Sequence, residues 1–168
     1  MSCQNSTKSE IPGRGGATPG TSVSFNPRSG SIRHDGGMTS ESWHVSERVD
    51  RPAADVYAYV SNPANLPRWA PGLGSSVAEV DGQWFVDTPA ERVRFAFAPL
   101  NDLGVLDHYL TLRSGEVVHV PMRVIADGSG SEVVLTVRRR PGMTDAEFKA
   151  DGAAVAADLA RLKRILED

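Results

Sequence analysis

Cysteine is almost absent from this sequence of 168 residues, which contains only Cys3. One thiol excludes an intramolecular disulfide, and its place near the N-terminus excludes a cysteine nucleophile or a cysteine-based metal site in the rest of the chain. We therefore expect a cytoplasmic protein. Long apolar runs are also missing: none approaches the roughly 18 residues of a membrane-spanning helix, so we predict no membrane span.

The short motifs that mark common cofactor and catalytic sites are missing as well. There is no P-loop, no dinucleotide-binding fingerprint, no Gly-x-Ser-x-Gly and no paired-cysteine motif. His108 and His119 fall on neighbouring predicted strands, but no third ligand follows at a spacing that would complete a metal site. We predict neither a cofactor nor a metal.

Large apolar side chains are scarce in residues 1–37, which contain seven Gly, seven Ser and three Pro. Such a segment buries too little apolar surface to offset the entropy of ordering it. We predict a disordered tail over residues 1–38 and one folded domain over residues 39–168. The tail carries a net charge of +2, which leaves −5 for the remainder of a chain whose total is −3. A mildly acidic domain predicts no nucleic-acid partner.

Met38 stands directly before the first patterned segment of the chain. We hypothesise that translation of the natural protein starts there and that residues 1–37 are an over-extended reading. N-terminal sequencing of the native protein tests this, and a terminus at Met1 or Ser2 contradicts it.

The first patterned segment predicts a strand and then two short helices. Trp43, Val45 and Val49 alternate with polar residues, as in a strand with one buried face. Pro52 suits the first turn of a helix, which the Asn62-Pro63 pair then ends. A second short helical turn is expected over residues 65–69.

Residues 75–140 predict a series of strands separated by turns. Asp81-Gly82 and Ser114-Gly115 have the composition of two-residue hairpin turns, and residues 127–130 that of a longer hairpin loop. Consecutive hairpins indicate an antiparallel sheet, in which the isolated first strand should pair beside a late strand. The predicted strands cover residues 76–80, 83–87, 91–98, 106–113, 116–126 and 131–139.

A long helix is expected at the C-terminus. Thr144 and Glu147 form a capping box, and apolar residues then recur with helical spacing at Phe148, Val155, Leu159, Leu162 and Leu166. The sheet should cover this apolar face. Gly152 predicts either a close approach of the sheet or a slight bend of the helix over a cavity.

Residues 45–57 and 60–69 carry a resemblance to a known superfamily. The strand, the helix that begins at Pro52, the Asn62-Pro63 break and Trp69 before Pro71-Gly72 resemble the START-like superfamily, also called SRPBCC or Bet v 1-like. Within it, they resemble bacterial proteins of the polyketide cyclase/dehydrase type. The resemblance covers residues 40–168, and residues 101–108 and 120–123 resemble one subgroup.

The resemblance implies an α+β helix-grip fold. A curved antiparallel sheet of about seven strands would wrap around the long C-terminal helix, with two short helices after the first strand. It also implies a ligand pocket between the concave face of the sheet and that helix.

The Ser114-Gly115 turn sets the expected register of the hairpin that would line this pocket. A two-residue turn pairs Tyr109 with Val120 and Asp107 with Met122. The face with Val118, Val120 and Met122 is the more continuously apolar, so we expect it to face the pocket. Asp107 and Tyr109 would then lie in or near the pocket, with His108, His119 and Arg123 on the outer face.

The candidate site residues follow from this register and from the implied pocket. Asp107 is either an anchor in the pocket or an acid bonded to a nearby loop amide, and Glu47 is either a pocket group or a strand-edge residue reaching water. Candidate catalytic residues are Asp107, Tyr109 and Glu47. The predicted ligand-binding residues are Trp69, Trp84, Phe95, Phe97, Asp107, Tyr109, Val120, Met122, Val155 and Leu159.

The leading functional hypothesis is binding of an apolar small molecule, such as a lipid, a polyketide or an isoprenoid-like compound. The alternative is an enzyme of the cyclase/dehydratase type, in which Asp107, Tyr109 or Glu47 moves a proton. A second alternative is a co-chaperone-like interaction module, which predicts a filled interior and an exposed apolar patch. The sequence leaves a monomer and a homodimer open.

Overall fold

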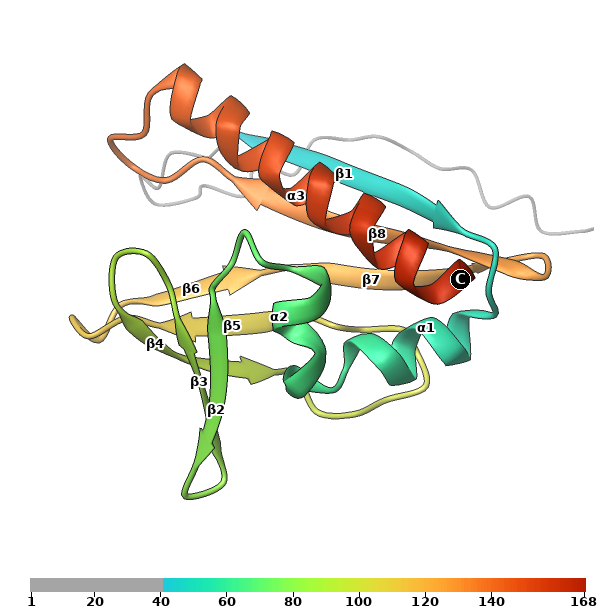
Figure 1. Ribbon diagram of the computed structural model, residues 1–168. Helices are drawn as coiled ribbons and strands as arrows, with labels where there is room; N and C mark the ends of the chain where they lie inside the picture. The colour runs from blue at the N-terminus through green and yellow to red at the C-terminus, as the bar shows by residue number, and fades with distance from the viewer. Residues whose placement is uncertain (1–40) are drawn as a thin grey trace, which may run out of the picture. The chain divides into compact units, whose positions relative to one another are not determined.

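The computed structural model of the chain describes residues 41–168. The predicted tail over residues 1–38 and the expected start at Met38 lie outside these residues. The described part is α+β, as predicted (Figure 1). In chain order it contains β1 (Ser42–Val49), α1 (Ala53–Val60), the 3-10 helix η1 (Pro63–Asn65), α2 (Leu66–Trp69), β2 (Ser76–Val80), β3 (Gln83–Asp87), β4 (Arg92–Phe97), β5 (His108–Thr111), β6 (Val117–Val120), β7 (Met122–Asp127), β8 (Gly130–Arg138) and α3 (Asp145–Glu167).

The strands form two antiparallel sheets, ordered β1-β8-β7 and β2-β3-β4-β5-β6. As expected, β1 pairs with a late strand, and Val45 lies opposite Leu135. The chain passes directly from one sheet to the other at Pro121, the single residue between β6 and β7. Proline has no N–H to donate, and the Pro121 carbonyl accepts from the Thr136 N–H at 2.9 Å in the other sheet. This break makes two strands of the predicted 116–126 strand, so the described part has eight strands instead of about seven.

The C-terminal helix α3 lies along β1 and β8 (Figure 1), and its other main contact is with α2. The capping box of Thr144 and Glu147 is present. Leu159 and Leu162 of α3 are buried in the core. A Cβ atom on Gly152 would stand 2.2 Å from the Trp43 ring, so the predicted close approach of the sheet is confirmed.

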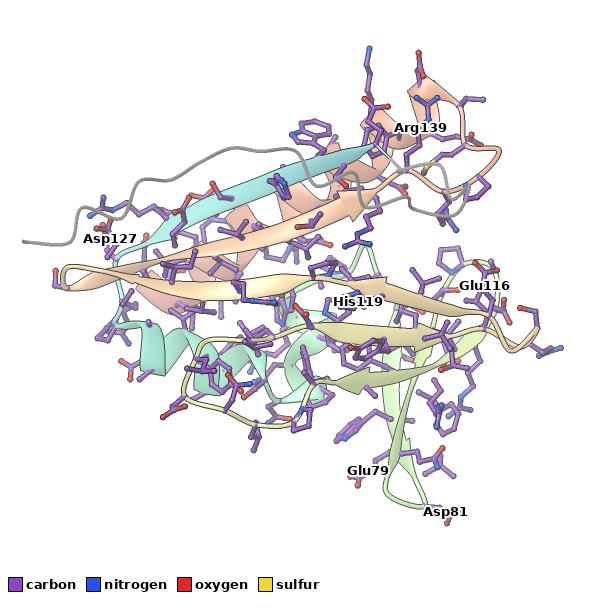
Figure 2. The ribbon with its side chains drawn as sticks, turned by 180° about the vertical axis from the view of Figure 1, so that it is seen from behind. Glu79, Asp81, Glu116, His119, Asp127 and Arg139 are labelled. Atoms are coloured by element: carbon purple, nitrogen blue, oxygen red, sulfur yellow. The ribbon has the colours of Figure 1, made fainter. Side chains whose placement is uncertain are left out.

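Of two hairpin turns predicted from their composition, one is confirmed and the other is wrong. Asp81-Gly82 forms the expected two-residue turn, with Val80 opposite Gln83; Figure 2 shows Asp81 at the tip of this hairpin. The longer loop predicted over residues 127–130 is wrong. Asp127 pairs with Gly130, which leaves only Gly128 and Ser129 in the turn.

The register predicted for the β5–β6 hairpin is also wrong. The turn has three residues, Arg113 to Gly115: the Leu112 N–H donates to the Glu116 carbonyl at 2.9 Å, and Gly115 has φ 89°. A type I turn followed by a left-handed glycine adds one residue to the loop. His108, not Tyr109, therefore lies opposite Val120. Because side chains alternate along a strand, this shift of one residue exchanges the two faces of β5.

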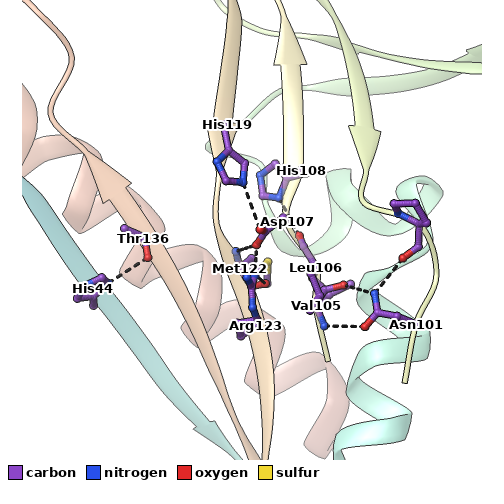
Figure 3. Close-up of polar contacts among 11 residues, drawn as sticks. His44, Asn101, Val105, Leu106, Asp107, His108, His119, Met122, Arg123 and Thr136 are labelled. Carbon is purple, nitrogen blue, oxygen red and sulfur yellow. Dashed lines mark hydrogen bonds and ion pairs between the residues drawn. The ribbon is translucent and has the colours of Figure 1, made fainter. Parts of the chain in front are cut away.

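The loop between β4 and β5, two strands of one sheet, contacts β7 of the other sheet; Figure 3 shows Asn101 and Val105 in this loop. The Asn101 side chain folds the loop on itself: its Oδ1 accepts from the Val105 N–H at 3.0 Å, and its Nδ2 donates to the Val105 carbonyl at the same distance. Gly104 then passes so close to β7 that a Cβ atom would lie 2.0 Å from the Val124 carbonyl oxygen. The Val124 N–H donates to the Gly104 carbonyl at 2.9 Å.

Candidate functional site

An aromatic groove lies along the inner face of β3 and β4. Trp84 and Phe95 are directly opposite each other in the ladder, and Phe97 follows Phe95 on the same face. The groove has a volume of about 440 Å³. Its lining includes Trp84, Phe95 and Phe97 from the strands, Ser61 and Pro63 after α1, and Pro99 and Leu100 after β4.

The groove brings together three of the residues predicted to bind a ligand, and it adds others that sequence reasoning missed. Ser61 and Pro63 belong to the Asn62-Pro63 helix break, which the sequence marked only as the end of a helix. Pro99 and Leu100 begin the β4–β5 loop, and Leu100 is 78% exposed. A leucine directly after an aromatic strand is the signal that the sequence offered for this wall.

His108 lies behind the aromatic floor of the groove. Its ring centroid is 5.2 Å from that of Phe95 and 5.7 Å from that of Phe97, and the two phenyl rings meet edge to face. The His108 side chain is buried, with 5% of its surface exposed. Burial withholds water from the charged imidazole and lowers the pKa of His108 to about 4. The expectation that His108 faces outward is therefore wrong.

The His108 ring is held by one hydrogen bond to the backbone. Its Nδ1 lies 3.3 Å from the carbonyl oxygen of Leu106 (Figure 3). A carbonyl oxygen only accepts, so Nδ1 carries the hydrogen of the neutral ring. The other nitrogen, Nε2, is then the lone-pair acceptor, and it has no hydrogen-bond partner among residues 41–168.

Asp107 and Tyr109 lie on the outer face of the sheet, so their expected placement in the pocket is wrong. The Tyr109 ring stacks on that of His119, with centroids 4.9 Å apart, and Tyr109 is 39% exposed; Figure 2 shows His119 on its strand from this side. Asp107 accepts from the Met122 N–H at 2.9 Å, contacts Nε2 of His119 at 3.2 Å and pairs with Arg123 (Figure 3). This cluster ties β5, β6 and β7 together where the chain changes sheets.

Two further acids, Glu47 on β1 and Asp158 on α3, also lie away from the groove. Glu47 is on the apolar face of β1, and its carboxylate is 3.6 Å from Nζ of Lys163 on the helix, which also donates to the Arg48 carbonyl at 2.6 Å. Because β1 is an edge strand and the Glu47 side chain is 30% exposed, the second alternative, a strand-edge residue reaching water, describes its position. Asp158 accepts from the Gly72 N–H at 3.4 Å, and burial raises the pKa of its carboxyl group.

The remaining predicted ligand-binding residues belong to the core. Trp69, Met122 and Leu159 are buried, while Val120 and Val155 are partly buried against them. No residue of α3 lines the groove, which departs from the implied pocket between sheet and helix.

The described part of the chain contains neither a group of metal ligands nor a membrane-spanning helix. Within residues 41–168 no three His, Cys, Asp or Glu side chains gather as a metal ion would require. In the same range no helix is both long and apolar enough to cross a membrane.

Comparison with known proteins gives a family and a fold. The family model described as polyketide cyclase / dehydrase and lipid transport matches residues 40–167. An uncharacterised protein from Bacillus thuringiensis has a structure with a TM-score of 0.61 at 14% identity, covering 76% of this chain and 100% of that one. A START superfamily protein from Mycobacterium smegmatis gives a TM-score of 0.53 at 13% identity, covering 75% and 97%.

A third solved structure, the Aha1 dimer from Colwellia psychrerythraea, has a TM-score of 0.60 at 13% identity and covers 76% of this chain and 96% of that one. At these identities the likeness shows the fold alone, and it confirms the predicted START-like architecture. The oligomeric state of this chain stays a prediction. A comparison with curated proteins gives no match.

Proposed function

We propose that this chain, which belongs to the polyketide cyclase/dehydrase and lipid transport family, binds an apolar small molecule in the groove on β3 and β4. The observation that carries the proposal is the aromatic floor of that groove, in which Trp84 and Phe97 are partly exposed and Phe95, 1% exposed, packs against Phe97. Its volume of about 440 Å³ lies in the range of about 300–1,000 Å³ that small-molecule sites occupy. A lipid, a polyketide or an isoprenoid-like compound has the matching surface.

The candidate acids lie away from the groove, and the charged residue in its lining is Arg94. Asp107 is already bonded to three protein groups on the outer face, and Glu47 is paired with Lys163 beneath α3. Neither carboxylate is part of the lining. These positions argue against the cyclase/dehydratase alternative as we framed it, because its acids do not meet a ligand in the groove.

The open groove also bears on the alternative of an interaction module. That alternative predicts a filled interior and an exposed apolar patch, and Leu100 and Leu103 of the β4–β5 loop are each 78% exposed. The interaction module therefore stays the second candidate, and the groove on β3 and β4 favours small-molecule binding as the first.

Titration with a neutral, apolar fluorescent naphthalene ketone tests the proposal. We expect the full chain to bind the dye and increase its emission. Trp84→Ala should weaken binding about tenfold, because the side chain supplies a large part of the floor. Phe85→Ala is the matched control, since Phe85 is the next residue on β3 and faces the other side of the sheet. Equal affinity in wild type and Trp84→Ala would place any binding elsewhere and contradict the proposal.

A further inference from the structure

A second pocket, here called the outer pocket, lies on the face of the larger sheet opposite to the groove. Its lining consists of Val80, Phe85, Arg92 and Arg113, and its volume is about 360 Å³. This volume lies in the range of about 300–1,000 Å³ that small-molecule sites occupy. The outer pocket shares no residue with the lining of the groove, so it is a separate candidate site.

The strand register brings the two arginines of the outer pocket together. Arg94 on β4 pairs with Phe85 on one side and with Thr111 on the other. Arg92 and Arg113 come two residues further along their strands, so alternation gives them the face of Phe85. Both also line the same pocket. The two guanidinium groups are therefore neighbours at one end of the β4–β5 ladder.

The charge of the outer pocket is unbalanced, because its lining contains two cations and no carboxylate. Asp87 lies 3.8 Å from Nε of Arg92 and also accepts from the Ser76 hydroxyl. Glu91 accepts from the backbone N–H of Arg113 at 2.9 Å. Within residues 41–168, no carboxylate oxygen lies within 4 Å of the Arg113 guanidinium. Like charges on facing positions of a sheet are destabilising, so an anion between the two arginines would relieve their repulsion.

Apolar side chains lie next to these cations. The guanidinium carbon of Arg92 stands 5.1 Å from the centroid of the Phe85 ring, a cation–π contact that holds this guanidinium over the ring. Val80, at the end of the β2–β3 hairpin, is 46% exposed and adds an aliphatic surface to the pocket. The outer pocket thus offers a place for an apolar ring beside a place for an anion.

We propose that the outer pocket binds an aromatic carboxylate, with its carboxylate group between Arg92 and Arg113. The ring of the ligand lies against Phe85 and Val80. A guanidinium group donates in a planar fork that matches the two oxygens of a carboxylate, which favours this anion over a rounder one. The site goes beyond the proposed function, because its residues and the charge of its ligand differ from those of the groove.

Two probes of the same shape test the inference: 2-naphthoate and its uncharged amide, 2-naphthamide. By equilibrium dialysis of the full chain at pH 7, we expect 2-naphthoate to bind about tenfold more tightly than the amide. Arg113→Gln should lower the affinity for 2-naphthoate about tenfold and leave that for the amide unchanged. Arg138→Gln is the matched control, since it removes the same charge from an exposed arginine on β8 in the other sheet.

Nuclear magnetic resonance of the wild-type chain locates the bound probe without any substitution. In a chain with ¹³C-labelled valine and leucine methyl groups, 2-naphthoate should move the signals of Val80, which lines the outer pocket. The signals of Leu100, which lines the groove, should stay in place.

The outcomes separate this inference from the proposed function. If the Leu100 signals move and the Val80 signals stay, the probe occupies the groove, which overturns the outer pocket while the proposed function stands. Equal affinity of Arg113→Gln and Arg138→Gln for 2-naphthoate, or no binding by wild type at about 1 mM, also overturns it. Binding of the neutral fluorescent dye tests the groove alone, so its failure leaves the outer pocket standing.

Discussion

The two sheets of this domain use the same kind of side chain in different ways. The packed half, defined here as β1, β7, β8 and α3, contains fully enclosed apolar residues such as Val49, Val133 and Leu162, while Trp43 and Ile125 on its surface are 43% and 49% exposed. In the open half, β2 to β6, Trp84 and Phe97 keep part of their surface accessible along the groove. The helix accounts for the difference, because its main contacts are with β1, β8 and α2. We infer that the packed half holds the fold together and that the open half is free to bind.

Truncation of a leucine in the packed half should give the largest effect. Leu159 on α3 is 1% exposed, so Leu159→Ala should lower the free energy of unfolding by about 3 kcal/mol through lost burial and a new cavity. Leu100→Ala, the same change at a residue 78% exposed beside the groove, should cost about 0.5 kcal/mol or less. Urea denaturation measures both, and equal costs would remove the distinction between the halves.

The link between the halves is the next most sensitive point. Gly104 has φ 70°, and a Cβ atom there would stand 2.0 Å from the Val124 carbonyl oxygen on β7. Gly104→Ala should cost about 2–3 kcal/mol, from the left-handed conformation and from displacement of the loop. Gly82→Ala is the matched control: its φ is 73°, but no atom lies within 4 Å of an added Cβ.

The Gly82 control should cost only the conformational part, about 1 kcal/mol. The difference between the two variants in urea denaturation then reports the contact with β7. If both glycines cost the same, the β4–β5 loop does not couple the two sheets through Gly104.

Alternation and capping were enough to predict most of the fold. The burial of Val45 and Val49 on β1 and the Thr144 capping box on α3 are local features, so the sequence shows them directly. Turn length was not predictable in the same way, since Ser114-Gly115 fits both a two-residue turn and the end of a three-residue turn. The structure has the longer turn, and that single residue moved His108 to the inner face and Asp107 and Tyr109 to the outer face.

The groove was only partly predictable for a different reason. Trp84, Phe95 and Phe97 stood out as aromatic residues on strands, but which of them stays partly exposed depends on contacts between distant parts of the chain. α3 packs on β1, β8 and α2, and the Trp43 ring lies against Gly152, and no local pattern states these contacts. A pocket under the helix was the expectation carried over from the resemblance.

Lowering the pH should reduce the free energy of unfolding through His108, which lies in the open half. Its pKa is about 4 in the folded chain against 6.5 for an ordinary histidine, so the unfolded chain takes up the proton first as the pH falls. The stability that depends on neutral His108 is fully present above pH 6.5 and is lost between pH 6.5 and 4. At pH 5 we expect a loss on the order of 2 kcal/mol relative to pH 7.5.

The comparison with His108→Gln isolates this titration, because glutamine has no proton to gain in the range. Urea denaturation at several pH values should show a steeper fall for wild type than for the variant between pH 6.5 and 5. Parallel curves would mean that the folded chain binds the His108 proton as readily as the unfolded chain does.

The smallest effect is expected at the edge of the packed half, where Glu47 meets Lys163. The two side chains are 30% and 33% exposed and 3.6 Å apart, so solvent screens their attraction. A double-mutant cycle with Glu47→Gln and Lys163→Met should give a coupling of about 0.5 kcal/mol in urea denaturation. Glu47→Gln should also leave dye binding unchanged, because Glu47 lies beneath α3 and outside the groove lining. A loss of dye affinity in a folded Glu47→Gln chain would move the binding site into the packed half and reverse the assignment of roles to the two sheets.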